Sequence, residues 1–171
     1  MTKTRMRTPL LTALLSAICT ITHVIGGSLL VGVADSDRLP WARPMKSSFH
    51  LTQAFDLPSS PWGSGHRGID IVAQTGTETY APASATVKFV GRVVDRDVIT
   101  LELHQDLLVS MEPVKSDLQV GDQVVRGQHI GEVASGGHCA MHCLHIGVRA
   151  FGEYVNPLQF YLTRPVLLPW E

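Results

Sequence analysis

Five residues in one short stretch are of types that bind transition metals. The segment GGHCAMHCLHIGV, residues 136–148, contains His138, Cys139, His142, Cys143 and His145. Imidazole nitrogen and thiolate sulfur are both common ligands of zinc. The stretch therefore predicts metal chemistry, but by itself it leaves open which side chains take part and for what purpose.

A second pair of metal-binding side chains lies far upstream, at His66 and Asp70. In an extended segment, residues four apart project to the same side. A catalytic zinc needs three protein ligands and one open position, and with His145 this pair would supply them. A His and an Asp at this spacing are also common by chance, so an exposed loop pair is the alternative interpretation.

The elements that must position these side chains read as β-strands. Short runs rich in β-branched residues recur between turn residues, and no amphipathic helix is longer than two turns, which favours an all-β domain. A short helix is expected over residues 156–162, with Pro157 in its first turn. The expected strands cover residues 68–72, 85–90, 98–103, 107–111, 123–125, 129–133 and 143–149.

The last of these strands has two unlike faces. Side chains alternate along a strand, so Leu144, Ile146 and Val148 share an apolar face that should pack inward. Cys143, His145, Gly147 and Arg149 lie on the opposite face. We expect this second face to line a surface or cleft and to present His145 as a metal ligand.

The first 34 residues indicate export. Lys3, Arg5 and Arg7 precede an uncharged apolar run over residues 9–34, which predicts a hydrophobic helix that is either a cleaved signal peptide or a retained membrane anchor. A buried N-terminal helix of the domain is the third and least favoured interpretation. The positive-inside tendency then places residues 35–171 outside the cytoplasm. Without the leader, 11 Lys and Arg face 15 Asp and Glu, a formal charge of −4, which argues against nucleic acid as a partner.

Four segments resemble motifs of the lysostaphin/LytM-type zinc metallopeptidases, in the family's order. GHRGID at 65–70 is similar to G-H-x-G-x-D, and CLHIGVR at 143–149 is similar to H-L-H-F-E-V-R. Residues 76–87 and 120–131 resemble G-T-P-V-x-A-P-x-x-G-x-V and V-G-D-x-V-x-x-G-Q-x-I-G. The resemblance runs from about residue 55 to 157. It implies an antiparallel β-sheet domain with a narrow groove over 55–162, after an irregular lead-in at 35–54 and before a tail at 163–171.

The resemblance also implies the zinc ligands and two departures from the family. The ligands carried over are His66, Asp70 and His145. Active members use two further histidines, and the corresponding positions here hold Cys143 and Pro113. A general base or an oxyanion donor each contributes roughly 10²- to 10⁴-fold to such a reaction, so their loss bears directly on activity.

Three residues are candidates to replace the missing histidines: Glu112, His138 and His142. Glu112 would serve as a base if it faces the groove, and otherwise it is a solvated strand residue. His138 and His142 would have to reach the groove from just before the ligand strand. For Cys139 and Cys143 we expect a disulfide, because the exported location favours oxidation. A structural zinc site formed by the cysteines, His138 or His142, and His145 is the alternative.

Two functions follow as hypotheses. One is an exported zinc metalloendopeptidase acting on peptidoglycan peptides in the cell wall. The other is a catalytically inactive domain that binds the wall or regulates another wall hydrolase. A transport or adhesion β domain with incidental motifs is a third interpretation.

Overall fold

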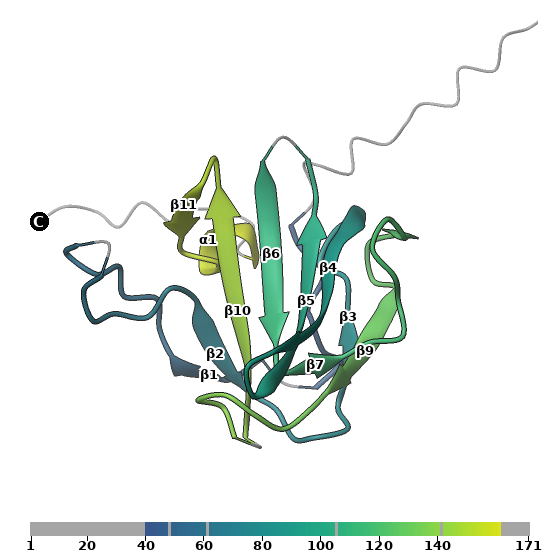
Figure 1. Cartoon of the computed structure of the whole chain (residues 1–171), viewed down its shortest axis with the longest axis horizontal. Helices are drawn as coiled ribbons and strands as arrows, with labels where there is room; N and C mark the ends of the chain where they lie inside the picture. Colours follow the sequence, from purple (N-terminus) through teal and green to yellow (C-terminus); the bar gives the residue numbers. More distant parts are fainter. Residues whose placement is uncertain (1–39, 48, 61, 105, 141, 162–171) are drawn as a thin grey trace, which may run out of the picture. The chain divides into compact units, whose positions relative to one another are not determined.

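The computed structural model describes residues 40–47, 49–60, 62–104, 106–140 and 142–161, and these residues form an antiparallel β domain (Figure 1). The expected hydrophobic leader at 1–34 and the tail at 163–171 lie outside the described residues. Within the described part of the chain, no helix is long and apolar enough to cross a membrane.

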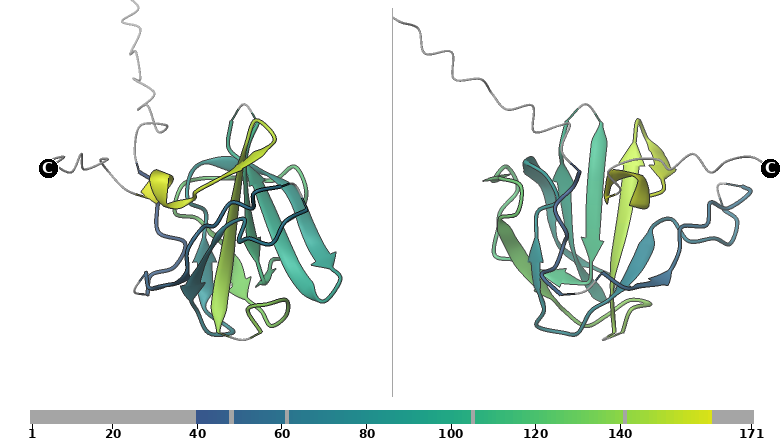
Figure 2. Two further views of the ribbon diagram at one scale, coloured as in Figure 1. Left: turned by 90° about the vertical axis from the view of Figure 1, so that its left-hand side faces the viewer. Right: turned by 180° about the vertical axis from the view of Figure 1, so that it is seen from behind.

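Two antiparallel sheets make up the domain. The larger has the order β1-β2-β10-β6-β5-β4-β8, with β11 paired to β10, and the smaller has the order β3-β9-β7 (Figures 1 and 2). The fold class expected from the sequence is confirmed. The strands are β1 Leu51–Gln53, β2 Ile69–Val72, β3 Glu78–Tyr80, β4 Ala85–Val93, β5 Arg96–Glu102, β6 Leu107–Glu112, β7 Val114–Lys115, β8 Gln123–Val124, β9 His129–Val133, β10 Cys143–Ala150 and β11 Glu153–Val155.

All seven expected strands are present, and four short ones were not expected. β1, β3, β7 and β11 have only two or three residues each, which is too short for an alternating pattern to be recognised. β1 lies inside the expected lead-in and pairs with β2. The short helix α1, Leu158–Tyr161, falls within the range expected for it.

The core lies on the apolar face of β10 and its neighbours. Leu144, Ile146 and Val148 are fully buried, as their alternation predicts. They belong to one hydrophobic cluster with residues of the small sheet, such as Ile130 and Val133, so both sheets share one core. Each Å² of apolar surface removed from water contributes about 25 cal/mol to the free energy of folding, so burial of these three side chains stabilises the strand that carries His145.

Candidate metal centre

Two adjacent strands present Asp70 and His145 side by side. β2 and β10 pair antiparallel with Asp70 directly opposite His145, so both side chains leave the sheet on the same face. The Nδ1 atom of His145 lies 2.7 Å from Oδ1 of Asp70. The Asp70 side chain is only 4% exposed and that of His145 only 13%. The strand pairing therefore fixes this carboxylate and this imidazole against each other.

His66 reaches the same point from the segment just before β2. Its backbone forms a β-bridge with Asp56, and its Nδ1 lies 2.8 Å from the carbonyl oxygen of Ala54. A carbonyl oxygen only accepts hydrogen bonds, so Nδ1 donates and the lone pair of the neutral ring is on Nε2. That Nε2 atom lies 3.1 Å from Oδ1 of Asp70 and 3.1 Å from Nδ1 of His145.

The three ligand atoms have the spacing that a tetrahedral zinc requires. Donors about 2.0–2.1 Å from a tetrahedral ion are roughly 3.3 Å apart, and the three separations in this triangle are 2.7, 3.1 and 3.1 Å. The Nε2 lone pair of His66 faces the carboxylate of Asp70 and the ring of His145. Electron-rich groups at this distance repel one another unless a proton or a cation lies between them. The donor set thus fits zinc, and a hydrogen bond on the far side of a ligating ring, here to Ala54, is typical of metal-bound histidine.

The glycines of the first motif have a steric reason. A Cβ atom on Gly68 would lie 2.6 Å from Cε1 and Nε2 of His145 and would also meet the carbonyl oxygen of Ile146. A Cβ atom on Gly65 would lie 2.6 Å from the carbonyl oxygen of Asp56. Only glycine lets the segment pack so closely against β10 at position 68 and against Asp56 at position 65. This packing on both sides of His66 brings its ring to the cluster.

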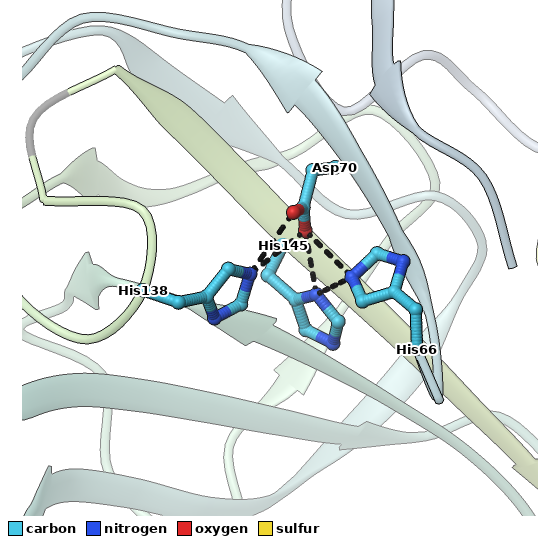
Figure 3. A group of neighbouring side chains, drawn as sticks. All are labelled: His66, Asp70, His138 and His145. Carbon is cyan, nitrogen blue, oxygen red and sulfur yellow. Dashed lines mark hydrogen bonds and ion pairs between the residues drawn. The ribbon is translucent and has the colours of Figure 1, made fainter. Parts of the chain in front are cut away.

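His138 also joins the cluster, from the loop before β10 (Figure 3). Its Nε2 lies 3.1 and 3.0 Å from the two carboxylate oxygens of Asp70. His66, Asp70, His138 and His145 each offer a ligand atom, and all four atoms lie within 4.8 Å of one another. Of the loop histidines considered from the sequence, His138 therefore reaches the site. His142 is exposed and is not part of this group.

The carboxyl group of Asp70 is held in its charged form. Burial by itself raises the pKa of Asp70, but hydrogen bonds from His145 and His138, together with their charges, outweigh burial and lower the pKa below 3.8. A carboxylate that stays ionised near neutral pH is ready to bind a cation.

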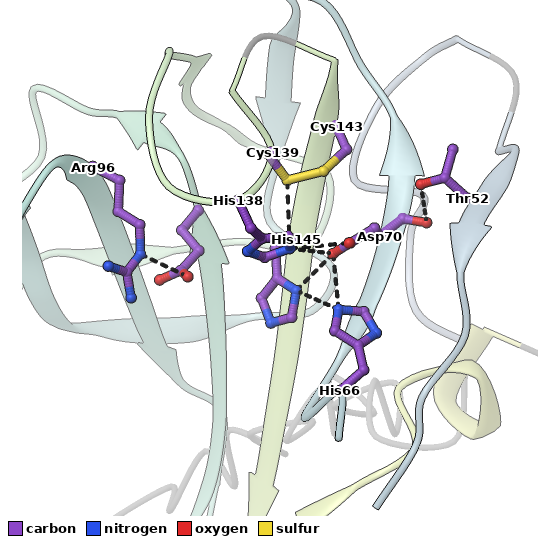
Figure 4. Close-up of a disulfide and its surroundings, with 9 residues drawn as sticks. Thr52, His66, Asp70, Arg96, His138, Cys139, Cys143 and His145 are labelled. Carbon is purple, nitrogen blue, oxygen red and sulfur yellow. Dashed lines mark hydrogen bonds and ion pairs between the residues drawn. A yellow bond between two sulfur atoms is a disulfide. The ribbon is translucent and has the colours of Figure 1, made fainter. Parts of the chain in front are cut away.

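Cys139 and Cys143 form the disulfide that the sequence predicted (Figure 4). The same two cysteines, with Asp70 and His138, are close enough to form a second metal-binding group. Sulfurs in a disulfide are not thiolates, however, so the alternative structural zinc site does not form in this state. The disulfide instead ties the loop that carries His138 to the first residue of β10.

Glu112 lies on β6 directly opposite His145, and its side chain lines a groove beside that histidine. Its Oε1 accepts a hydrogen bond from Nε of Arg96 at 2.8 Å, and its side chain is 17% exposed. The condition set from the sequence, that Glu112 face the groove, is therefore met. Pro113 follows β6 and is buried, and Cys143 is in the disulfide, so neither position supplies an imidazole.

A groove of about 420 Å³ runs over the face of the sheet beside His145. Arg67, Arg96, Arg149 and Glu112 line it, together with the rings of Phe89 and Tyr154. The sequence reasoning missed Arg96. The alternation of Arg96, Val98 and Thr100 on β5 was a usable indication, since all three line this groove.

Comparisons with known proteins agree with this geometry. The profile of Peptidase family M23 matches residues 64–157. An uncharacterised protein of Mycobacterium tuberculosis is 36% identical over 141 residues, which are 79% of this chain and 56% of that protein. A second uncharacterised protein of that organism is 32% identical over 110 residues, covering 63% of this chain and 27% of the relative. The chain thus spans about half the length, or less, of these curated relatives.

Solved structures share the fold. The catalytic domain of the prophage-encoded M23 protein EnpA from Enterococcus faecalis has a TM-score of 0.58 and 26% identity over 68% of this chain and 95% of that domain. A zinc-containing peptidase from Vibrio cholerae has a TM-score of 0.61 at 20% identity over 70% of this chain and 40% of that one. A chain of the SpoIIQ–SpoIIIAH complex has a TM-score of 0.63 at 20% identity, and the match covers 74% of this chain and 93% of that one. At such identity the last two show the fold alone. With its motifs, fold and profile match in agreement, the chain belongs to peptidase family M23.

Proposed function

We propose that the chain is an exported zinc metalloendopeptidase that acts on peptides of peptidoglycan. The observation that carries the proposal is the convergence of His66, Asp70 and His145 at the wall of a groove. Zinc, when bound there, supplies a Lewis acid for hydrolysis of a peptide bond. The leader at 1–34 and its membrane topology are part of the proposal, with residues 35–171 outside the cytoplasm and attached to the membrane only if residues 9–34 remain.

The chain's own residues have distinct roles in this proposal. His66 and His145 would hold the metal through Nε2 and Nδ1, and Asp70 would hold it through its carboxylate. Glu112 stands next to His145 and accepts and returns protons as the peptide is cleaved. Arg96 fixes the orientation of the Glu112 carboxylate by its hydrogen bond.

The charge of the groove supports a substrate with carboxylates. Three guanidinium groups and one carboxylate are found among the described residues that line it: Arg67, Arg96 and Arg149, with Glu112. Stem peptides of peptidoglycan carry free carboxylates, which arginine binds through paired hydrogen bonds. The exposed ring of Tyr154 and that of Phe89 give the groove apolar walls for a peptide side chain.

A binding module is the second candidate function. Two observations favour it: Cys143 is in a disulfide, and Pro113 occupies the place of the other auxiliary histidine. SpoIIQ, which shares the fold, is in a complex with SpoIIIAH in its solved structure. In this alternative the groove binds wall peptide or another wall hydrolase without cleaving a bond.

Digestion of purified sacculi by the zinc-loaded full chain separates the two functions. If the chain is an enzyme, soluble peptides appear, and Glu112→Gln lowers their rate of release by at least about 10²-fold with zinc content unchanged. Glu132→Gln, an exposed glutamate on β9 outside the groove, is the matched control. Sedimentation of the chain with sacculi, without release of peptides, would instead establish the binding module.

A further inference from the structure

The family resemblance accounts for three metal ligands, but it does not account for the presence of His138 beside them. A catalytic zinc has three protein ligands and keeps one position open. Here a fourth side chain, His138, already lies at the cluster, with Nε2 within 3.1 Å of both carboxylate oxygens of Asp70. We propose that His138 is a fourth metal ligand, which closes the site at rest and must leave before a substrate can bind. This inference rests on the proposed zinc site.

The approach of His138 is built into the fold by packing of its loop. A Cβ atom on Gly137 would lie 2.6 Å from Cδ of Arg96, and a Cβ atom on Gly136 would lie 3.0 Å from the Cα atom of Arg96. The backbone N–H of Gly136 also donates to the carbonyl oxygen of Ala140 at 3.0 Å. The residues just before His138 are thus pressed against the start of β5, and the loop closes on itself immediately after it.

The disulfide completes this support on the other side of His138. Cys139 is the next residue in the chain, is 5% exposed and is bonded to Cys143 at the start of β10. Its sulfur lies 3.9 Å from Nε2 of His138. A dashed line marks this contact in Figure 4. Since β10 also carries His145, the disulfide links His138 covalently to the strand of another ligand. Cys143 stands where active members of the family have an auxiliary histidine. Through the disulfide it holds a different histidine, His138, at the cluster.

His138 differs from the other three residues in its exposure. Its side chain is 48% exposed, whereas those of His66, Asp70 and His145 are 9%, 4% and 13% exposed. A half-exposed ring can leave the cluster without opening the core, and the buried ligands cannot. The site therefore has three fixed ligands and one that can be displaced by a peptide carbonyl or carboxylate.

The test measures metal binding by the full chain, with no need for activity. After the metal is removed, Zn²⁺ affinity is measured by competition with a chromophoric chelator, and Co²⁺ is added as a spectroscopic probe. His138→Ala should lower the affinity at least about 10-fold, because loss of even an indirect partner of a ligand costs 10- to 100-fold. The visible spectrum of bound Co²⁺ should change as well, since a nitrogen donor is exchanged for solvent.

The matched control is His142→Ala, which removes an exposed histidine from the same loop. Its Zn²⁺ affinity and Co²⁺ spectrum should equal those of the wild type, and an equal loss in both variants would overturn ligation by His138. Wild-type affinity and spectrum in His138→Ala would overturn the inference and leave the three-ligand site intact. Absence of Co²⁺ and Zn²⁺ binding by the wild type would overturn both that site and the fourth ligand.

Discussion

Replacing Gly68 by alanine should damage the metal centre and the sheet together. The new Cβ atom would lie 2.6 Å from Cε1 and Nε2 of His145. Non-bonded carbon atoms prefer about 3.5–4.0 Å, so the ring or the backbone must move by roughly 1 Å. The same Cβ atom also meets the carbonyl oxygen of Ile146. Ile146 is the residue of β10 that pairs with Ile69 of β2. The strain therefore falls on the strand pair that places Asp70 opposite His145.

The magnitude follows from the two contacts. Overpacking of a well-packed site costs about 1–3 kcal/mol of unfolding free energy, and backbone on one side of the clash favours the upper end of that range. Displacement of a ligating ring should lower Zn²⁺ affinity by roughly 10- to 100-fold, as expected when the support of a ligand is lost.

Urea unfolding of the metal-free chain and chelator competition for Zn²⁺ measure the two effects separately. Gly147→Ala is the matched control, because its Cβ atom would make only ordinary contacts, 3.4 Å to the carbonyl oxygen of Arg67 and 3.7 Å to Nε2 of His145. It should leave both quantities near wild-type values. A wild-type urea midpoint and wild-type affinity in Gly68→Ala would refute the steric argument, as would equal losses in both variants.

Three further predictions concern stability. Replacing Cys139 and Cys143 together by serine should cost about 2 kcal/mol, from loss of a short cross-linked loop, as urea unfolding would show. Tyr161→Phe should leave stability unchanged or raise it by about 1 kcal/mol, because the buried hydroxyl has no hydrogen-bond partner among the described residues. A clear loss of stability would contradict that account. Because the folded-state pKa of Asp70 is lowered below 3.8, its contribution to the stability of the metal-free chain is present above about pH 4 and lost at lower pH. Asp70→Asn should therefore show a smaller decline between pH 5 and 2 in a pH series of unfolding curves, and an equal decline would refute the assignment.

The local pattern of the sequence was sufficient for the main strands. Leu144, Ile146 and Val148 alternate with polar or small residues, and burial of one face follows from the period of a strand wherever the pattern is long enough. β7 and β11, with two and three residues, carry too few positions for this argument, and their formation depends on the neighbours with which they pair.

Some residues of the candidate site could be recognised from the sequence, and others only from the tertiary structure. The motif around His66 and Asp70 and the strand around His145 could be recognised in the sequence, because each is a local arrangement with a fixed spacing. That Glu112 stands beside His145 could not, since it depends on the register between β6 and β10. The approach of His138 required more still. The disulfide to β10 was expected, because its two cysteines are only four residues apart. The packing of Gly136 and Gly137 against Arg96 was not, because a contact between such distant parts of the chain exists only once the tertiary structure has formed.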